Sequence, residues 1–152
     1  MSLIIATGSN LGDSLHLLNE AKELLGRDLL LIAASRIYKS TAVDYENQPD
    51  FFNQVLEFQL PPLSPEATLQ HLLKIEHSMG RVRETWRGPR TIDIDIIFWG
   101  TDNITTEHLT VPHPRWMERS FVVRPLQELP FFQTIQNWFT IPKSFKVDAF
   151  PI

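Results

Sequence analysis

The sequence predicts an α+β sandwich, a fold class in which helices pack on a sheet. Its hydrophobic pattern switches between strand and helix periods in the order β, α, β, β, α, β, and more helix follows. The chain of 152 residues can bury one core and is too short for two ordinary domains. Its composition, 43% hydrophobic and 21% charged, is typical of a globular protein. We therefore expect a single domain over residues 1–152.

The first two elements are a strand and an amphipathic helix. The apolar run at residues 3–6 predicts a buried strand, which we expect to end in a turn at Gly8. Asp13 or Ser14 can cap the helix that follows, because its apolar residues recur at spacings of three and four. We expect this helix to close at Gly26, since glycine is the usual residue after a helix end.

The next elements are two strands and a second helix. Residues 29–38 and 52–60 predict strands on either side of a polar loop. Ser64 predicts a helix start, because a capping hydroxyl is followed by Pro65 at the first helical position. Gly80 is the expected stop of this helix.

The rest of the chain predicts shorter elements. Apolar residues alternate over residues 92–97 and predict a strand that runs out at Trp99. A further short strand is expected at residues 108–111. Prolines restrict later helices to short pieces, such as residues 115–123.

Asp93 and Asp95 form the most informative pair. Residues two apart in a strand point to the same face, with their Cα atoms roughly 6.5 Å apart. Two carboxylates on one face can share a Mg²⁺ ion, which keeps water and phosphate oxygens as its other ligands. The alternative is an exposed strand face with two solvated acids. The isoleucines that flank these acids suggest a central strand, which seldom carries two unpaired acids, and so favour the metal site.

Positive charge is concentrated next to these acids, although the net charge is −4. Seven of the nine arginines lie within residues 81–124, and a cluster of this kind attracts a compact anion. Four of them precede the acids in a segment that Gly88 and Pro89 keep from being regular helix. One guanidinium group can form two parallel hydrogen bonds to phosphate oxygens. We therefore interpret this segment as a phosphate-binding loop rather than a solvated basic surface. The four are Arg81, Arg83, Arg87 and Arg90.

Three weaker signals remain. The glycine-bearing segment at residues 8–13 could present backbone N–H groups to an anion, although a bare turn is the commoner object and no Walker lysine follows. Phe51 and Phe121 could sandwich a flat heterocycle, although aromatic residues more often belong to a core. His113 lies between two prolines that fix its backbone.

Composition excludes several classes. The chain has no cysteine, so any metal must be held by oxygen or imidazole. No apolar run reaches the ~20 residues that span a bilayer, and the N-terminus lacks the pattern of a signal peptide. We expect a cytoplasmic protein without membrane or nucleic-acid partners.

Several segments together resemble the 6-hydroxymethyl-7,8-dihydropterin pyrophosphokinase family over residues 3 to about 130. The most specific is Gly88-Pro89-Arg90-Thr91-Ile92-Asp93-Ile94-Asp95. The others, in chain order, are Gly8-Ser9-Asn10-Leu11-Gly12, Gln48-Pro49-Asp50-Phe51-Phe52-Asn53, Gly80-Arg81-Val82-Arg83, Leu109-Thr110-Val111-Pro112-His113-Pro114-Arg115 and Glu118-Arg119-Ser120-Phe121.

The resemblance implies a ferredoxin-like α/β/α sandwich around a mainly antiparallel sheet. It also implies transfer of pyrophosphate from ATP to the hydroxymethyl group of the pterin, with release of AMP, in folate biosynthesis. Two Mg²⁺ ions would be held by Asp93 and Asp95. We expect a monomer with ATP and the pterin as its small-molecule partners.

The resemblance also assigns roles to individual residues. The implied catalytic residues are Arg81, Arg90, Asp93 and Asp95. The implied nucleotide-binding residues are Glu76, Arg81, Arg83, Arg90, Ile96, Thr110, His113 and Arg119. The implied pterin-binding residues are Ser40, Ala42, Val43, Phe51, Asn53, Trp86, Asp93 and Phe121.

The chain departs from the family pattern in two places. The family has an aromatic residue directly before Gly-Pro-Arg, whereas here Arg87 separates Trp86 from Gly88. Trp86 could still serve as an aromatic lid. The tail at residues 133–152 has no family counterpart, and we expect it to cover hydrophobic surface.

Two rival functions are kept open. A nucleic-acid-binding module would use the arginines and aromatic residues without needing the two aspartates. A magnesium-dependent transferase acting on another acceptor would share the nucleotide half of the site and differ in its aromatic pocket.

Overall fold

The computed structural model describes residues 1–41, 49–80, 92–141 and 144–152. Groups of strands are separated by helices along the chain, and a last strand lies close to the C-terminus. In order, the elements are β1 (Ser2–Ser9), α1 (Ser14–Asp28), β2 (Leu31–Ala34), β3 (Tyr38–Ser40), β4 (Phe51–Gln59), α2 (Pro65–Ser78), β5 (Asp93–Trp99), β6 (Ile104–Thr105), β7 (Thr110–Val111), the 3-10 turn η1 (Trp116–Glu118), α3 (Ser120–Leu126), α4 (Phe132–Trp138) and β8 (Ala149–Pro151).

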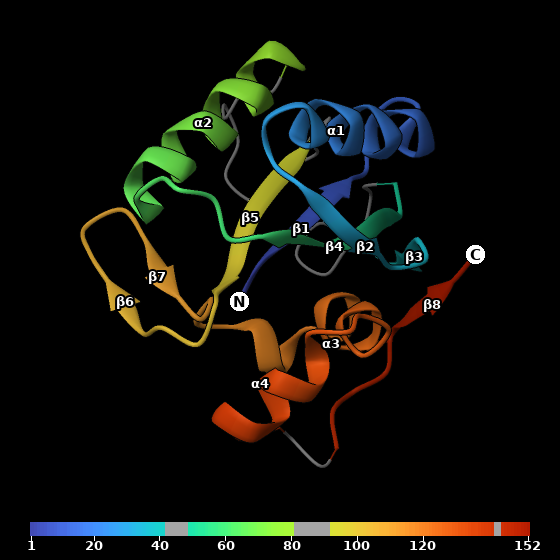
Figure 1. Cartoon of the computed structure of the whole chain (residues 1–152). Helices are drawn as coiled ribbons and strands as arrows, with labels where there is room; N and C mark the ends of the chain where they lie inside the picture. Colours follow the sequence, from blue (N-terminus) through green and yellow to red (C-terminus); the bar gives the residue numbers. More distant parts are fainter. Residues whose placement is uncertain (42–48, 81–91, 142–143) are drawn as a thin grey trace.

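The main sheet has the strand order β5-β1-β4-β3-β8, and β2 also pairs with β4. Every pairing in it is antiparallel. Helices α1 and α2 lie on one side of the sheet, and α3 and α4 lie on the other (Figure 1). The prediction of an α/β/α sandwich around an antiparallel sheet is therefore confirmed, with β2 and β3 together in the place of one strand of the β-α-β-β-α-β pattern.

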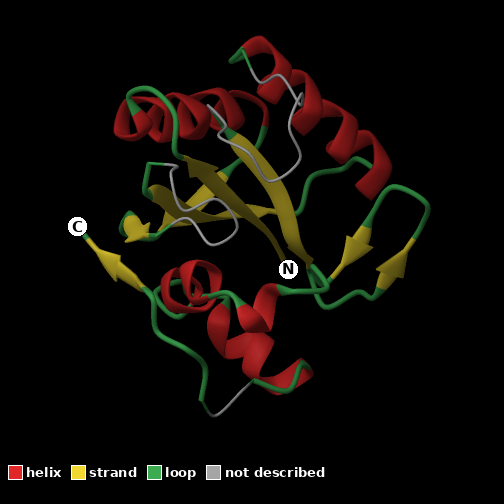
Figure 2. Ribbon diagram, turned by 180° about the vertical axis from the view of Figure 1, so that it is seen from behind, coloured by secondary structure: helices red, strands yellow, loops and turns green. Residues whose placement is uncertain are grey.

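Two hydrophobic cores lie on the two faces of this sheet. The view from behind shows helices on both sides of the strands (Figure 2). The first core, on the side of α1 and α2, includes Leu3, Ile5, Leu18, Leu25, Leu56, Phe58, Leu72, Ile94 and Ile96. The second core, on the side of α3 and α4, includes Ile4, Val55, Ile97, Phe98, Trp116, Val122, Val123, Leu126 and Ile135. The tail contributes Ile135 and, at its margin, Phe139, Ile141 and Phe145, so it does cover apolar surface of the sheet.

The two long helices begin where their capping residues predict. Asp13 accepts a hydrogen bond from the backbone N–H of His16 through Oδ1 (3.3 Å), and Ser64 Oγ accepts one from Ala67 (3.1 Å). Gly80 follows α2 with φ of +84°, as expected for a glycine beyond a helix end.

The predicted end of α1 was wrong. The helix continues through Gly26 to Asp28, and the N–H of Leu29 still bonds to the carbonyl of Leu25 (3.0 Å). The periodic apolar pattern holds Leu25 in the core, and packing of that face outweighs the low helix propensity of one glycine.

Two strand predictions also need correction. Gly8 does not begin a turn, because β1 continues to Ser9 with β4 on one side and β5 on the other. The strand expected at residues 29–38 is divided into β2 and β3. Ser35 lies at the break, where its Oγ accepts a hydrogen bond from the N–H of Val55 (3.0 Å). A side chain thus takes the place of a backbone carbonyl in the ladder.

The helix expected at residues 115–123 is interrupted at Arg119. This residue has an extended backbone (φ −109°, ψ 104°), which separates η1 from α3. Within the described part of the chain, no helix is both long and apolar enough to cross a membrane. The cytoplasmic location stays a prediction.

Candidate active site

Asp93 and Asp95 project from β5 toward the side of the sheet that carries α3. Ile94 and Ile96 alternate with them and lie in the first core, whereas Ile97, two positions beyond Asp95, lies in the second core. Both aspartates are half-buried. The expectation that the two carboxylates share one face is therefore confirmed.

The strand that carries these acids is not central in the sheet. It stands at one end of the strand order, with only β1 as a paired neighbour among the described strands. The alternating isoleucines show only that one face of β5 is buried. They do not indicate that strands pair with it on both sides, so the prediction of a central strand was wrong. Glu76, a buried residue of α2, accepts a hydrogen bond from the N–H of Ile94 through Oε2 (2.7 Å). This carboxylate satisfies a backbone donor of β5 between the two acids and fixes α2 against the strand.

A row of residues crosses the sheet from the acids to Asn53. Gly8 is paired with Asp93 on one side and with Asn53 on the other. Neighbouring strands are about 4.8 Å apart, so the backbones of Asp93 and Asn53 are roughly 10 Å apart across Gly8. Ala6 lies in the same way beside Asp95. Neither Gly8 nor Ala6 places a large side chain between the acids and the amide.

Gly8 makes room for the amide of Asn53. A Cβ atom at Gly8 would lie 2.6 Å from Asn53 Oδ1, closer than van der Waals contact allows. Asn53 is 8% exposed, and its Nδ2 has no hydrogen-bond partner in the described part of the chain. A buried donor without a partner costs roughly 1–3 kcal/mol, so this amide is suited to a ligand acceptor.

His113 lies beside the outer edge of β5. Its backbone N–H donates to the carbonyl of Ile97 (2.9 Å), and its Nδ1 accepts a hydrogen bond from the N–H of Arg115 (3.2 Å). Burial lowers its pKa from 6.5 to about 4, helped by the charges of Arg119 and Arg115 and opposed by Asp93. The imidazole is therefore neutral at pH 7, with Nε2–H as the donor.

Arg119 and Phe121 flank the start of α3, which packs against β3 and β4. The guanidinium carbon of Arg119 lies 5.6 Å from the centre of the Phe121 ring, within the range of a cation–π contact. Since Arg119 also lowers the pKa of His113, these three side chains belong to one neighbourhood with Asp93.

Ser40 and Phe51 lie in the next row of the sheet. They are paired across β3 and β4, two residues along each strand from the pair of Tyr38 and Asn53. Phe51 therefore shares a face with Asn53. Nearby, Lys39 and Asp50 form an ion pair at 3.4 Å on the rim.

The remaining candidates divide into two groups. Thr110 is exposed in β7, whereas the side chain of Ile96 is only 3% exposed and lies in the first core, on the other face from the acids. A contact of Ile96 with a nucleotide would have to use its backbone. Six candidates lie outside the described residues: Ala42, Val43, Arg81, Arg83, Trp86 and Arg90.

The described residues offer a metal two carboxylates and no more. Among them there is no group of three or more His, Asp or Glu side chains that could hold an ion. Asp93 and Asp95 thus fit a hard cation that takes its other oxygens from water or phosphate, which is the habit of Mg²⁺, better than a metal held only by protein.

Sequence reasoning missed how Gly8 and Glu76 contribute to the site. Gly8 was interpreted as a turn, and its contact with Asn53 depends on the pairing of strands 45 residues apart. Glu76 was expected beside the nucleotide. Its hydrogen bond to β5 joins residues 18 positions apart, and no sequence pattern near either residue indicates it. The unbroken run of strand residues on both sides of Gly8 could have indicated that the glycine lies within a strand.

The sequence is similar to one family profile and to several known proteins. Residues 4–130 match the sequence profile of 7,8-dihydro-6-hydroxymethylpterin-pyrophosphokinase. The chain is 42% identical over 127 residues to the 2-amino-4-hydroxy-6-hydroxymethyldihydropteridine pyrophosphokinase of Bacillus subtilis, covering 82% of this chain and 75% of that protein. It is 38% identical over 127 residues to the protein of the same name from Haemophilus influenzae, covering 82% of this chain and 79% of that one.

Other relatives are longer. The chain is 39% identical over 129 residues to the folic acid synthesis protein fol1 of Pneumocystis carinii; the match covers 84% of this chain and spans only 17% of that protein. The fold is similar to that of a Plasmodium falciparum HPPK-DHPS crystal structure, with a TM-score of 0.65 at 16% identity over 84% of this chain and 40% of the other. The profile covers most of the chain, and the Bacillus and Haemophilus proteins are matched over most of their length. The chain therefore belongs to the 7,8-dihydro-6-hydroxymethylpterin-pyrophosphokinase family.

Proposed function

We propose that the chain transfers pyrophosphate from ATP to the hydroxymethyl group of 6-hydroxymethyl-7,8-dihydropterin, in folate synthesis. The hydroxymethyl oxygen forms a bond to the β-phosphorus, the bond from this phosphorus to the oxygen bridging to the α-phosphorus breaks, AMP leaves, and the hydroxyl proton passes to solvent. Family membership supports this reaction. We also propose that residues 1–152 act as one domain and that the protein works as a monomer.

One observation supports the assignment of the site most directly: the row of Asp93, Gly8 and Asn53 across the sheet. It puts Asp93, with Asp95 beside it, at one end of the row and an amide donor without a hydrogen-bond partner among the described residues at the other. The carboxylates can hold the Mg²⁺ that accompanies a triphosphate, and the amide can pair with the polar edge of a pterin. Gly8 and Ala6 place no large side chain between the two ends.

Asp93 and Asp95 would hold Mg²⁺. When bound, this metal neutralises charge that develops on the phosphate oxygens. The two carboxylates supply a fixed negative surface, and the hydrogen bond from Ile94 to Glu76 keeps their strand in place. No strong base is required, because alignment and charge neutralisation carry most of the catalysis in this class of reaction.

The side chains next to the acids suit a triphosphate. Arg119 is a permanent cation, and the neutral imidazole of His113 offers an N–H donor without a charge that varies near pH 7. We propose that Thr110 and the backbone of Ile96 lie along the nucleotide, and that Glu76 acts there indirectly, through β5. The roles of Arg81, Arg83 and Arg90 toward the phosphates are proposed from the sequence alone.

The acceptor would be held on the other side of Gly8. We propose Phe51 and Phe121 as the two faces of a sandwich around the pterin ring and Asn53 as a donor to its edge. Ser40, Ala42 and Val43 would line the pocket, and Trp86 would cover it. The unpartnered Nδ2 of Asn53 supports the polar part of this arrangement.

The reaction is tested by incubating the protein with MgATP and 6-hydroxymethyl-7,8-dihydropterin and identifying the nucleotide product. We expect AMP in equal amount with the pterin pyrophosphate. Formation of ADP would refute pyrophosphate transfer, and turnover only with a different acceptor would refute the choice of pterin.

The acid pair is tested by Asp93→Ala and Asp95→Ala. Each should lower kcat/KM at least about 10²- to 10³-fold, because charge on the phosphates would lose its counter-ion. Asp102→Ala, which removes an exposed carboxylate just beyond β5, is the matched control and should retain wild-type activity. Equal activity of all three variants would contradict a metal role for the pair.

A further inference from the structure

We propose that the C-terminal strand β8 is a positioning element for the pterin pocket, which sets the separation of the two elements that carry Phe51 and Phe121. The inference rests on the proposed function, because it assumes that these aromatic residues hold the acceptor. It concerns residues beyond position 130, where the match to the family ends.

The strand extends the sheet on the side of the pocket. β8 pairs with β3, so that Ala149 lies opposite Ser40, and Ser40 in turn lies opposite Phe51 in β4. The paired strands β8, β3 and β4 thus connect the tail to Phe51, one of the two proposed aromatic faces of the pocket. Ala149 is completely buried.

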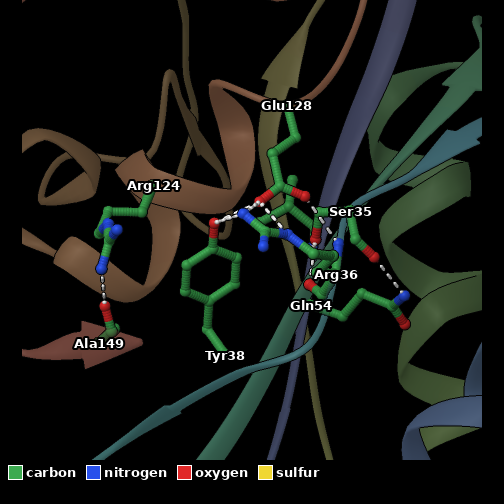
Figure 3. A network of polar contacts seen from close by, with 8 residues as sticks. Ser35, Arg36, Tyr38, Gln54, Arg124, Glu128 and Ala149 are labelled. Carbon is green, nitrogen blue, oxygen red and sulfur yellow. Dashed lines mark hydrogen bonds and ion pairs between the residues drawn. The ribbon is translucent and has the colours of Figure 1, made fainter. Parts of the chain in front are cut away.

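The same tail residues are attached to the start of α3. Ser120 Oγ accepts hydrogen bonds from the N–H groups of Asp148 and Ala149, both at 3.3 Å. Arg124 donates through Nη1 to the carbonyl of Ala149 (2.6 Å), as Figure 3 shows. Ser120 directly precedes Phe121, so this attachment lies next to the other aromatic face.

A second attachment between β3 and α3 lies at the far end of the helix. Tyr38 donates its hydroxyl proton to Glu128, just beyond α3, and Arg36 binds the same carboxylate through its backbone N–H (2.8 Å) and Nε (3.1 Å), as Figure 3 shows. Arg124, which takes part in the first attachment, also reaches toward the second. Its guanidinium carbon lies 5.6 Å from the centre of the Tyr38 ring and 5.5 Å from the centre of the Phe150 ring. The two attachments therefore tie both ends of α3 to the sheet, in addition to the packing of its buried face, and the tail provides the attachment nearest Phe121.

The two halves of the site should therefore respond differently to loss of the tail. The acid pair and His113 are held by β1, α2 and the edge of β5, which the tail strand does not contact through paired backbones. Stacking on two aromatic faces depends on their separation, and a shift of about 1 Å is enough to weaken it. Arg119 directly precedes Ser120, so it is the one proposed nucleotide residue that lies at the start of α3. Pterin binding should therefore weaken clearly more than nucleotide binding.

The test uses Ala149→Asp in the full-length chain, because a carboxylate at this completely buried position would force β8 off the sheet edge. Val147→Asp is the matched control, since it adds the same charge two residues earlier at a position that is 48% exposed. Hydrogen exchange at the backbone N–H groups of residues 149 and 150 reports whether the strand has left. Calorimetric titration measures Kd for a non-hydrolysable ATP analogue and for 6-hydroxymethyl-7,8-dihydropterin in its presence.

We expect Ala149→Asp to raise the pterin Kd about tenfold and the Kd of the ATP analogue by a smaller factor of about two to three, and Val147→Asp to leave both unchanged. A pterin Kd within twofold of wild type after release of the strand would overturn the proposal. An equal loss for both ligands would also overturn it, because it would indicate general destabilisation.

A second variant covers the case in which Ala149→Asp does not fold or does not release the strand. Ser120→Ala with Arg124→Met removes the attachment between tail and helix while leaving the backbone pairing with β3 available. The same split between the two ligands is expected, and its absence would overturn the proposal. Failure of the wild-type chain to bind the pterin would refute the proposed function itself, whereas wild-type binding that no tail variant alters would refute only the positioning role.

Discussion

Gly8 is the residue that allows the amide of Asn53 to lie close against β1. Gly8→Ala would place a Cβ atom 2.6 Å from Asn53 Oδ1, so the amide must move. We expect KM for the pterin to rise several-fold and the free energy of unfolding to fall by about 1–3 kcal/mol. Steady-state kinetics and urea denaturation measure the two effects.

Gly26 provides a matched control for this substitution. It lies within α1, and a Cβ atom there would meet nothing within 4 Å. Gly26→Ala should therefore stabilise the protein by about 0.5–1 kcal/mol and leave both KM values unchanged. If Gly8→Ala behaved like Gly26→Ala, the close approach of Gly8 to Asn53 would have no functional importance.

His113 should make the stability of the ligand-free protein depend on pH. Its pKa is about 4 in the folded chain and near 6.5 when unfolded. Its contribution to stability is therefore fully present above pH 6.5 and is lost as the pH falls from 6.5 toward 4, because only the unfolded chain takes up the proton in that range. His113→Asn should lose less stability than wild type between pH 6.5 and 4, as measured by denaturation at each pH. Parallel curves for the two proteins would contradict the buried, neutral imidazole.

The placement of single site residues could be predicted where it depends only on neighbouring positions in the sequence. Asp93 and Asp95 were predicted to share a face because strand alternation depends only on their spacing of two. The neighbourhood of Gly8 and Asn53, in contrast, depends on the register between β1 and β4. No pattern within either segment specifies that register.

At the scale of the elements, Glu57 joins the sheet to the start of α4. This residue of β4 is 3% exposed. Its Oε2 accepts a hydrogen bond from Ser2 Oγ (2.9 Å) and its Oε1 accepts one from the N–H of Phe131 (3.0 Å). A polar side chain therefore crosses the second core and holds the turn before α4 against the central strands.

Glu57→Gln tests this connection. The amide has one oxygen for two donors, so one donor would face an NH₂ group, and we expect a loss of about 1–3 kcal/mol in the free energy of unfolding. Ser2→Ala should cost less, because it removes one partner and leaves the bond to Phe131. Both KM values should stay within twofold of wild type. A change in KM without loss of stability would place Glu57 in the active site instead.

The elements themselves were predicted best where a side chain signals a boundary. Asp13 and Ser64 mark helix starts through bonds to residues three positions away, and the sequence contains that spacing. The end of α1 and the division between β2 and β3 depend on tertiary contacts, namely the burial of Leu25 and the bond from Val55 to Ser35. The edge position of β5 could not be predicted either, because alternating isoleucines indicate a buried face and do not count neighbouring strands.

At the scale of the whole molecule, both faces of the sheet are covered by helices, but the second core is completed only by the tail. Phe139 contacts Phe98 with ring centres 5.3 Å apart, and Ile135 is fully buried. These residues follow the segment that matches the family. The aromatic residues of the tail predicted that it would be buried against the protein. The pairing of β8 with the edge of β3 could not be predicted, because a strand of three residues is too short to give a recognisable pattern.

The two ends of the sheet are protected in different ways, by the carboxylate of Glu76 at β5 and by β8 at β3. No strand of the described part of the chain covers the outer edge of β2, where Leu30, Leu31 and Ile32 are 65%, 38% and 48% exposed. An uncovered apolar edge can recruit a strand from another molecule. Ile32→Lys should therefore reduce concentration-dependent light scattering without lowering the thermal midpoint, and unchanged scattering would locate self-association elsewhere. A strand that carries none of the proposed site residues is thus the one expected to limit how concentrated a solution of this protein can become.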